Sequence, residues 1–129
     1  MMALAHFTLA TADVEATAQF IERTLGYRRV AVPANSPIAV VWFDLGHGQQ
    51  MHLLHVDRFE ASAFEGEFGR HVALHHPAAD FDALRARLTG AGATLIEPQR
   101  PTPFARFFFR EPVNGYVFEV IDGASHFDQ

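Results

Sequence analysis

With 129 residues, 49% of them apolar, and a mean hydropathy near zero, the chain predicts one soluble globular domain with a sizeable core. The formal charge of −5 comes from 15 acidic and 10 basic residues, all of the latter Arg, and the absence of a basic stripe argues against a nucleic-acid partner. The longest apolar run, residues 38–43, is too short to cross a membrane, and residues 1–7 lack the pattern of a signal peptide, so we expect a cytoplasmic protein.

The first half of the chain predicts a strand, a helix and three further strands. Alternating residues indicate the first strand, Asp13 is suited to cap the helix, and Gly26 ends it. The short sequence Gly46-His47-Gly48 is typical of the turn of a β-hairpin. The predicted elements are strands over residues 3–10, 27–32, 38–45 and 49–56 and a helix over residues 14–25.

The second half repeats this order after a polar linker over residues 57–69. Its predicted elements are strands over residues 71–76, 93–97, 104–110 and 116–122 and a helix that begins after Asp80. Each half therefore reads β-α-β-β-β. We predict an α+β fold within a single domain, residues 1–129, in which two βαβββ modules, about 3–56 and 70–123, form a cupped mixed sheet.

Four polar residues occupy equivalent positions in the two modules. His6 and His71 open the first strands, and His52 and Glu119 lie on the last strands, 46 and 48 residues further on. In each of these strands the opposite face is apolar, as expected for a face that packs under a helix. Taken alone, a histidine on a strand is more often a partnered or exposed residue than a ligand.

Taken together, the four positions predict a site for one divalent metal ion. Cys is absent, so the ligands must be nitrogen and oxygen atoms, and three imidazoles with one carboxylate suit Zn, Ni, Fe or Mn. We therefore predict His6, His52, His71 and Glu119 as metal ligands. His75, on the face of His71, is an acid/base candidate.

Aromatic residues lie near these positions in both modules. Trp42 and Phe109 each precede the last-strand polar residue by ten positions, and alternation predicts that Phe107 shares the face of Phe109. We interpret them as an aromatic lining of the cleft, which favours a small, partly apolar substrate with oxygen atoms for the metal. Two of the other histidines, His47 and His126, are interpreted as surface residues.

These motifs resemble the vicinal oxygen chelate superfamily, which includes glyoxalase I, extradiol dioxygenases, fosfomycin-resistance enzymes and bleomycin-binding proteins. The resemblance rests on the two strand-opening histidines, the segment Leu25-Gly26-Tyr27, the turn Glu111–Gly115 and the closing segment Asn114–Glu119. It implies paired modules around a metal and places the family's four ligand positions on the four predicted residues. It also implies a homodimer and catalytic roles for Glu119, as a base, and for His52, as an acid or base.

The resemblance leaves the reaction open. A glyoxalase-like lyase or isomerase is our first interpretation, although Ala10 and Val56 replace the polar residues with which glyoxalase I holds glutathione. Thr8 matches a substrate-binding Thr of the fosfomycin enzymes, but residues 101–103, Pro-Thr-Pro, do not supply their Ser-rich loop. We therefore expect a substrate other than a glutathione adduct, with Thr8 among its contacts.

Two alternatives belong to other functional classes. An extradiol dioxygenase would use His6, His71 and Glu119 as its triad, with His52 as acid/base, although Phe109 stands where those enzymes usually carry a Tyr. A metal-free binding module of the bleomycin-resistance kind would use the aromatic cleft alone. Retention of all four polar positions argues against this last interpretation.

Overall fold

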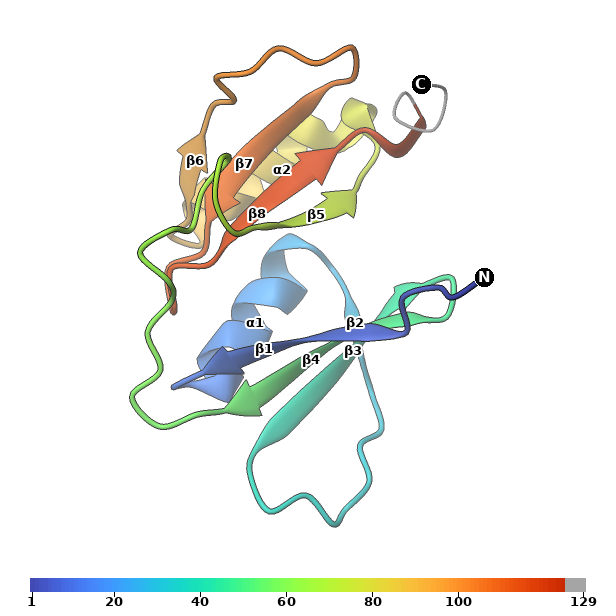
Figure 1. Cartoon of the computed structure of the whole chain (residues 1–129), viewed down its shortest axis with the longest axis vertical. Coiled ribbons are helices and arrows are strands. Elements are labelled where there is room, and N and C mark those ends of the chain that lie inside the picture. The colour runs from blue at the N-terminus through green and yellow to red at the C-terminus, as the bar shows by residue number, and fades with distance from the viewer. Residues whose placement is uncertain (125–129) are drawn as a thin grey trace. The chain divides into compact units, whose positions relative to one another are not determined.

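The computed structural model describes residues 1–124, and the chain divides into two compact units, Met1–Glu60 and Ala61–Gln129 (Figure 1). The predicted surface position of His126 falls outside the described residues. Across residues 1–124 the helices are too short or too polar to span a membrane. Each unit is built as predicted from one helix and four strands.

Unit 1 follows the predicted order β-α-β-β-β. Its elements are β1 (His6–Thr11), α1 (Val14–Thr24), β2 (Arg28–Val30), β3 (Val40–Gly46) and β4 (Gln49–His55). The sheet order is β1-β4-β3-β2, with β1 parallel to β4 and the other pairs antiparallel. Asp13 caps α1, since its carboxylate accepts from the backbone N–H of Ala16 at 3.0 Å. Gly26, at φ +75°, takes the left-handed conformation that ends the helix.

Unit 2 has the same topology. Its elements are β5 (Val72–His75), a 3₁₀ turn η1 (Ala78–Asp80), α2 (Phe81–Gly90), β6 (Thr94–Ile96), β7 (Arg106–Arg110) and β8 (Val117–Ile121). The sheet order is β5-β8-β7-β6, with β5 parallel to β8. The predicted α+β fold with two βαβββ modules is therefore confirmed.

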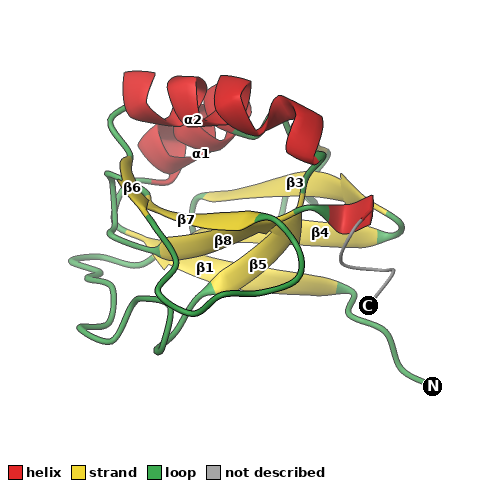
Figure 2. Ribbon diagram, turned by 90° about the horizontal axis from the view of Figure 1, so that it is seen from above, coloured by secondary structure: helices red, strands yellow, loops and turns green. Residues whose placement is uncertain are grey.

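Each helix covers one face of its own sheet (Figure 2). In unit 1 the buried side chains of α1, such as Ile21, pack with β3 and β4, where Phe43 and Met51 are fully buried. In unit 2 the ring of Phe81 on α2 contacts that of Phe107 edge to face, at 5.1 Å between centroids. Since the helix takes the apolar face, the polar residues lie on the other face of each sheet.

The register of β7 against β8 differs from our prediction. Phe108, and not its neighbours, pairs directly with Glu119, so Phe107 and Phe109 lie on the opposite face, and the prediction that they line the cleft is wrong. Phe107 contacts α2, and Phe109 stacks on Phe118.

The hairpin turns explain the error. The β3–β4 hairpin contains an irregularity between Asp44 and Gly46, and this register places Trp42 opposite His52, ten residues apart. The β7–β8 hairpin turns through residues 111–116 without a matching irregularity, which makes the equivalent separation eleven. The two hairpins of the repeat therefore differ by one residue, and one residue reverses every side chain on a strand.

The turn before β8 is organised by a buried carboxylate. Glu111 is 2% exposed, and its two oxygens accept from the backbone N–H groups of Val113, Asn114 and Tyr116 at 2.7 to 3.1 Å. At this position the carboxylate fixes the path of the chain into β8. It therefore fixes where β8, the strand that carries Glu119, begins.

Candidate functional site

In unit 1 the two predicted ligands lie side by side on neighbouring strands. The rings of His6 on β1 and His52 on β4 stack at 3.9 Å between centroids, with planes 14° apart. Trp42 on β3 stacks on His52 at 4.1 Å, with planes 4° apart, and Thr8 pairs with His52 across β1 and β4. The structure thus brings Thr8 and Trp42, both predicted substrate contacts, to the predicted ligand pair.

A cavity of about 320 Å³ adjoins these four side chains. Its remaining lining is largely apolar, with two polar side chains, and consists of Val32, Pro33, Asn35, Ser36, Val40 and Leu54. This volume lies at the lower end of the range for small-molecule sites. Shape and lining together suit a small ligand that carries both carbon and oxygen.

His52 is held in one protonation state and one tautomer. Burial, and then the nearby charge of His6, lower the pKa of His52 below 6.5, so its imidazole is neutral at pH 7. Its Nε2 lies 2.8 Å from Oε1 of Gln50, which can only accept, so Nε2 carries the proton. The lone pair of His52 is therefore on Nδ1.

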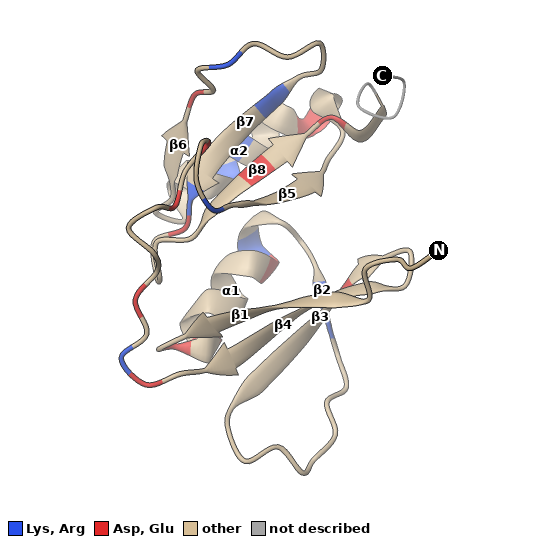
Figure 3. Ribbon diagram, in the orientation of Figure 1, with Lys and Arg blue, Asp and Glu red and all other residues tan. Residues whose placement is uncertain are grey.

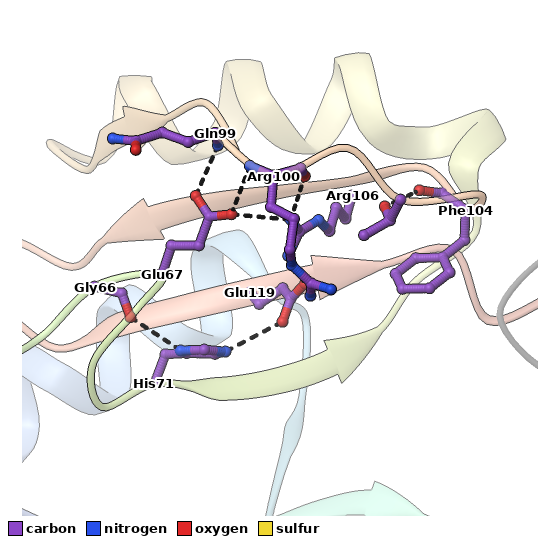
Figure 4. A network of polar contacts seen from close by, with 9 residues as sticks. Gly66, Glu67, His71, Gln99, Arg100, Phe104, Arg106 and Glu119 are labelled. Carbon is purple, nitrogen blue, oxygen red and sulfur yellow. Dashed lines mark hydrogen bonds and ion pairs between the residues drawn. The ribbon is translucent and has the colours of Figure 1, made fainter.

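In unit 2 the other two predicted ligands also come together. Nε2 of His71 lies 3.2 Å from Oε1 of Glu119, which is 6% exposed (Figure 4). Nδ1 of His71 donates to the backbone carbonyl of Gly66 at 3.0 Å, which leaves a lone pair on Nε2 of the neutral ring. Two acceptor atoms then face each other at hydrogen-bond distance, and this arrangement needs a cation, either a proton or a metal ion.

The His71–Glu119 pair fits a divalent metal ion. Donor atoms about 2.1 Å from one ion subtend roughly 100° when they are 3.2 Å apart, between octahedral and tetrahedral angles. A backbone carbonyl that accepts from the second ring nitrogen is the usual support of a metal-binding histidine. Neither unit by itself gathers three or more His, Asp or Glu side chains into a metal-binding cluster, as far as residues 1–124 show.

Arg106 is a member of the site that our sequence reasoning did not single out. Its side chain is 4% exposed, and its guanidinium donates to Oε2 of Glu119 at 2.9 Å and to Oε2 of Glu67 at 3.0 Å (Figure 4). It also donates to the backbone carbonyl of Arg100 at 2.6 Å. Figure 3 shows a basic stretch on β7 and an acidic stretch on the neighbouring strand β8.

Glu67 and Gly66 come from the segment that we predicted to be a linker. Residues 61–70 instead form part of unit 2, where Glu65 is buried and accepts from the backbone N–H of Val117 at 2.8 Å. Two acidic residues so close to Gly66 were the available signal, together with the arginine that opens the phenylalanine-rich strand β7. Neither signal shows which residue forms an ion pair with Glu67 or with Arg106.

Phe108 and His75 differ in how close they lie to His71. Phe108 is the repeat equivalent of Trp42, and its ring meets that of His71 edge to face at 5.3 Å. His75 lies on the face of His71 but four residues further on, about 13 Å along an extended strand. It lines another cavity, of about 220 Å³, next to Asp122.

A model of the Glyoxalase/Bleomycin resistance protein/Dioxygenase superfamily matches residues 3–120, and the chain belongs to this family. The resemblance to the vicinal oxygen chelate superfamily is thereby confirmed. None of the curated proteins matches the chain.

Solved structures with the same fold include fosfomycin-resistance and glyoxalase-like proteins. FosX from Mesorhizobium loti has 21% identity and a TM-score of 0.74, over 100% of this chain and 99% of that one. A mutant of FosX from Listeria monocytogenes, complexed with Mn(II) and a dihydroxypropylphosphonic acid, has 19% identity and a TM-score of 0.74, over 95% and 94%. A possible glyoxalase from Bacillus cereus has 21% identity and a TM-score of 0.67, over 94% and 99%. At these identities the similarity concerns the fold.

Proposed function

We propose that the protein is a divalent-metal-dependent enzyme that acts as a lyase or isomerase on a small, partly apolar, oxygenated substrate. The observation that carries the proposal is the 3.2 Å approach of Nε2 of His71 to Oε1 of Glu119, a contact that either a proton on the imidazole or a divalent ion between the two atoms satisfies. The proposed ligands of Zn, Ni, Fe or Mn are this pair in unit 2 and the pair of His6 and His52 in unit 1. The Mn(II) complex of FosX adds support for a divalent ion in this fold.

The proposed chemistry divides between the ion and the chain. A bound divalent ion supplies a Lewis acid that polarises an oxygen atom of the substrate. His52 has its lone pair on Nδ1 and would give it to the ion as a ligand, so it is a proton acceptor only in the dioxygenase candidate, where it does not bind the metal. Glu119, with one oxygen held by Arg106, is the proton-transfer candidate of the lyase or isomerase. His75, about 13 Å from His71 along the strand and in another cavity, lies too far away for the role that the sequence predicted for it. Thr8 and Trp42 would contact the polar and apolar parts of the substrate.

One observation favours an extradiol-type dioxygenase as the second candidate. His52 is stacked between His6 and Trp42, and its Nε2 already donates to Gln50. A histidine engaged in this way can act as an acid or base without being a ligand, which leaves two histidines and Glu119 as the triad.

Metal analysis of protein purified without a His-tag tests both candidates. We expect a stoichiometric divalent ion, with Zn, Ni, Mn and Fe(II) each offered in turn, and its loss in His71→Ala and Glu119→Ala. His47→Asn is the matched control, since His47 is exposed in the β3–β4 turn and should leave the metal content unchanged. A lyase or isomerase with four ligands should also lose the ion in His52→Ala, whereas the dioxygenase triad should keep it.

Substrate assays separate the remaining outcomes. Turnover of 2-oxoaldehyde adducts supports the first proposal, and oxygen uptake with catechols that requires His52 supports the second. A protein that binds none of the four ions at saturation would exclude both enzymes, and the metal-free binding module would then be the remaining interpretation. Fosfomycin with Mn(II) is the arm that tests the reaction of the structural relatives. We also propose a homodimer, which light scattering after size exclusion measures directly.

A further inference from the structure

Arg106 is a buried cation held between two carboxylates of unit 2 (Figure 4). One terminal nitrogen donates to Oε2 of Glu119, and the other donates to Glu67 and to the carbonyl of Arg100. Nε makes no hydrogen bond and is buried, the one side-chain atom in this condition among residues 1–124. Because this buried donor has no acceptor, the contacts of the two terminal nitrogens must stabilise the buried guanidinium.

Glu67 fixes the guanidinium from the other side. Oε1 of Glu67 accepts from the backbone N–H of Gln99 at 2.7 Å, and Oε2 accepts from that of Arg100 at 3.1 Å. The carboxylate of Glu67 is thus hydrogen-bonded both to the backbone of the loop between β6 and β7 and to Arg106. The backbone N–H groups of this loop therefore orient the carboxylate of Glu67, Glu67 orients the guanidinium of Arg106, and Arg106 orients the carboxylate of Glu119.

We infer that Arg106 is a positioning residue, which holds Oε2 of Glu119 and thereby directs Oε1 alone toward the metal-facing nitrogen of His71. The inference rests on the proposed function, because the presented oxygen is a proposed metal ligand. Only an arginine suits the role: its planar fork reaches both carboxylates at once, whereas a lysine offers a single point of charge. The ring centroid of Phe108 lies 5.3 Å from the guanidinium carbon of Arg106, so this ring restricts the movement of the guanidinium on another side.

A positioning role and a mere charge effect predict opposite results. If Arg106 acted only through its charge, its removal would take a cation away from a cation site and tighten metal binding. If Arg106 positions Glu119, its removal frees the carboxylate to rotate and weakens metal binding. Outer-shell partners of metal ligands typically account for about tenfold to a hundredfold in affinity.

The experiment measures the dissociation constant for Mn(II) and for Zn(II) by competition with a chelating dye, at a temperature where circular dichroism shows each variant folded. We expect Arg106→Gln and Arg106→Lys each to bind about tenfold to a hundredfold more weakly than the wild type. Glu67→Gln keeps an acceptor for the loop but weakens the hold on Arg106, and we expect a smaller loss. Arg100→Ala is the matched control, because Arg100 contributes only backbone groups and should bind as the wild type does.

Each outcome decides the inference. Wild-type affinity in Arg106→Lys, or tighter binding in Arg106→Gln, overturns positioning while the metal site itself stands. A wild-type protein that binds neither ion overturns the proposed function and this inference together. A lower unfolding midpoint with unchanged metal affinity in the folded variant assigns Arg106 a purely structural role. Where Arg106→Gln does not fold, Arg106→Lys and Glu67→Gln carry the same test.

Discussion

Replacement of Glu111 by Ala removes the acceptor for three backbone N–H groups in the turn that leads into β8. The N–H of Tyr116 is buried, so the loss of its acceptor costs about 1–3 kcal/mol. The N–H groups of Val113 and Asn114 are closer to solvent, and exchange of a carboxylate for water there costs about 0.5–1 kcal/mol each. We therefore expect Glu111→Ala to lower the free energy of unfolding by about 3 kcal/mol.

Two conservative variants grade the effect. Glu111→Gln keeps one acceptor oxygen but turns an amide N–H₂ toward backbone donors, and we expect roughly half the loss. Glu111→Asp keeps both oxygens on a side chain that is one methylene shorter, and we expect a loss of about 1 kcal/mol or less. The order of stability should be wild type, Asp, Gln and Ala.

Urea unfolding followed by far-UV circular dichroism measures these differences. Fluorescence alone is unsuited, because the single tryptophan, Trp42, lies in unit 1. Hydrogen exchange of the β8 amides should show faster opening in the Ala variant than in the wild type. An Ala variant within 1 kcal/mol of the wild type, or an Asp variant less stable than Ala, would refute the role given to this carboxylate.

The loop of unit 2 and the ring stack of unit 1 give two further predictions. Gly69→Ala should destabilise the protein and weaken metal binding, because a Cβ there would collide with the carbonyl of Phe64, whereas Gly66→Ala, with open space around its Cβ, should be close to wild type in urea unfolding and in metal titration. Protonated imidazole quenches a stacked indole, so the fluorescence of Trp42 should fall as the pH drops, with a midpoint below 6.5 because burial and then a neighbouring imidazole lower the pKa of His52. Since the unfolded state takes up the proton at a higher pH than the folded state, this site also removes stability as the pH falls from 6.5 through the folded pKa. A midpoint at or above 6.5, or the same titration in His52→Gln, would contradict the assignment.

Local patterns in the sequence determined the architecture. Alternation over residues 3–10, the cap at Asp13 and the turn Gly46-His47-Gly48 each depend on neighbours close in the chain. The structure contains the cap, the turn and the strand, which runs over His6–Thr11. The repeat then placed the predicted ligands on equivalent strands. The structure brings His6 to His52 and His71 to Glu119, because the first and last strands of each unit pair in parallel and place each pair on one face, two positions apart in the register.

The register of β7 against β8 lay outside what these patterns determine. Ten residues separate Trp42 from His52, but eleven separate Phe108 from Glu119, since one hairpin carries an irregularity that the other lacks. A difference of one residue in the pairing does not alter the alternation of either strand. It alters only which faces meet, and this is decided by the backbone of the turn.

The sequence by itself determined the fold, the repeat and the candidate ligand pairs, because periodicity and turn chemistry act over a few residues. Only the tertiary structure decided that Arg106 lies between Glu119 and Glu67, 39 residues distant in the chain. A buried charged side chain needs a partner of opposite charge, but this rule does not predict which residue, or which loop, provides it. That choice follows from how the segment over residues 61–70 packs in unit 2, which depends on contacts across the whole unit.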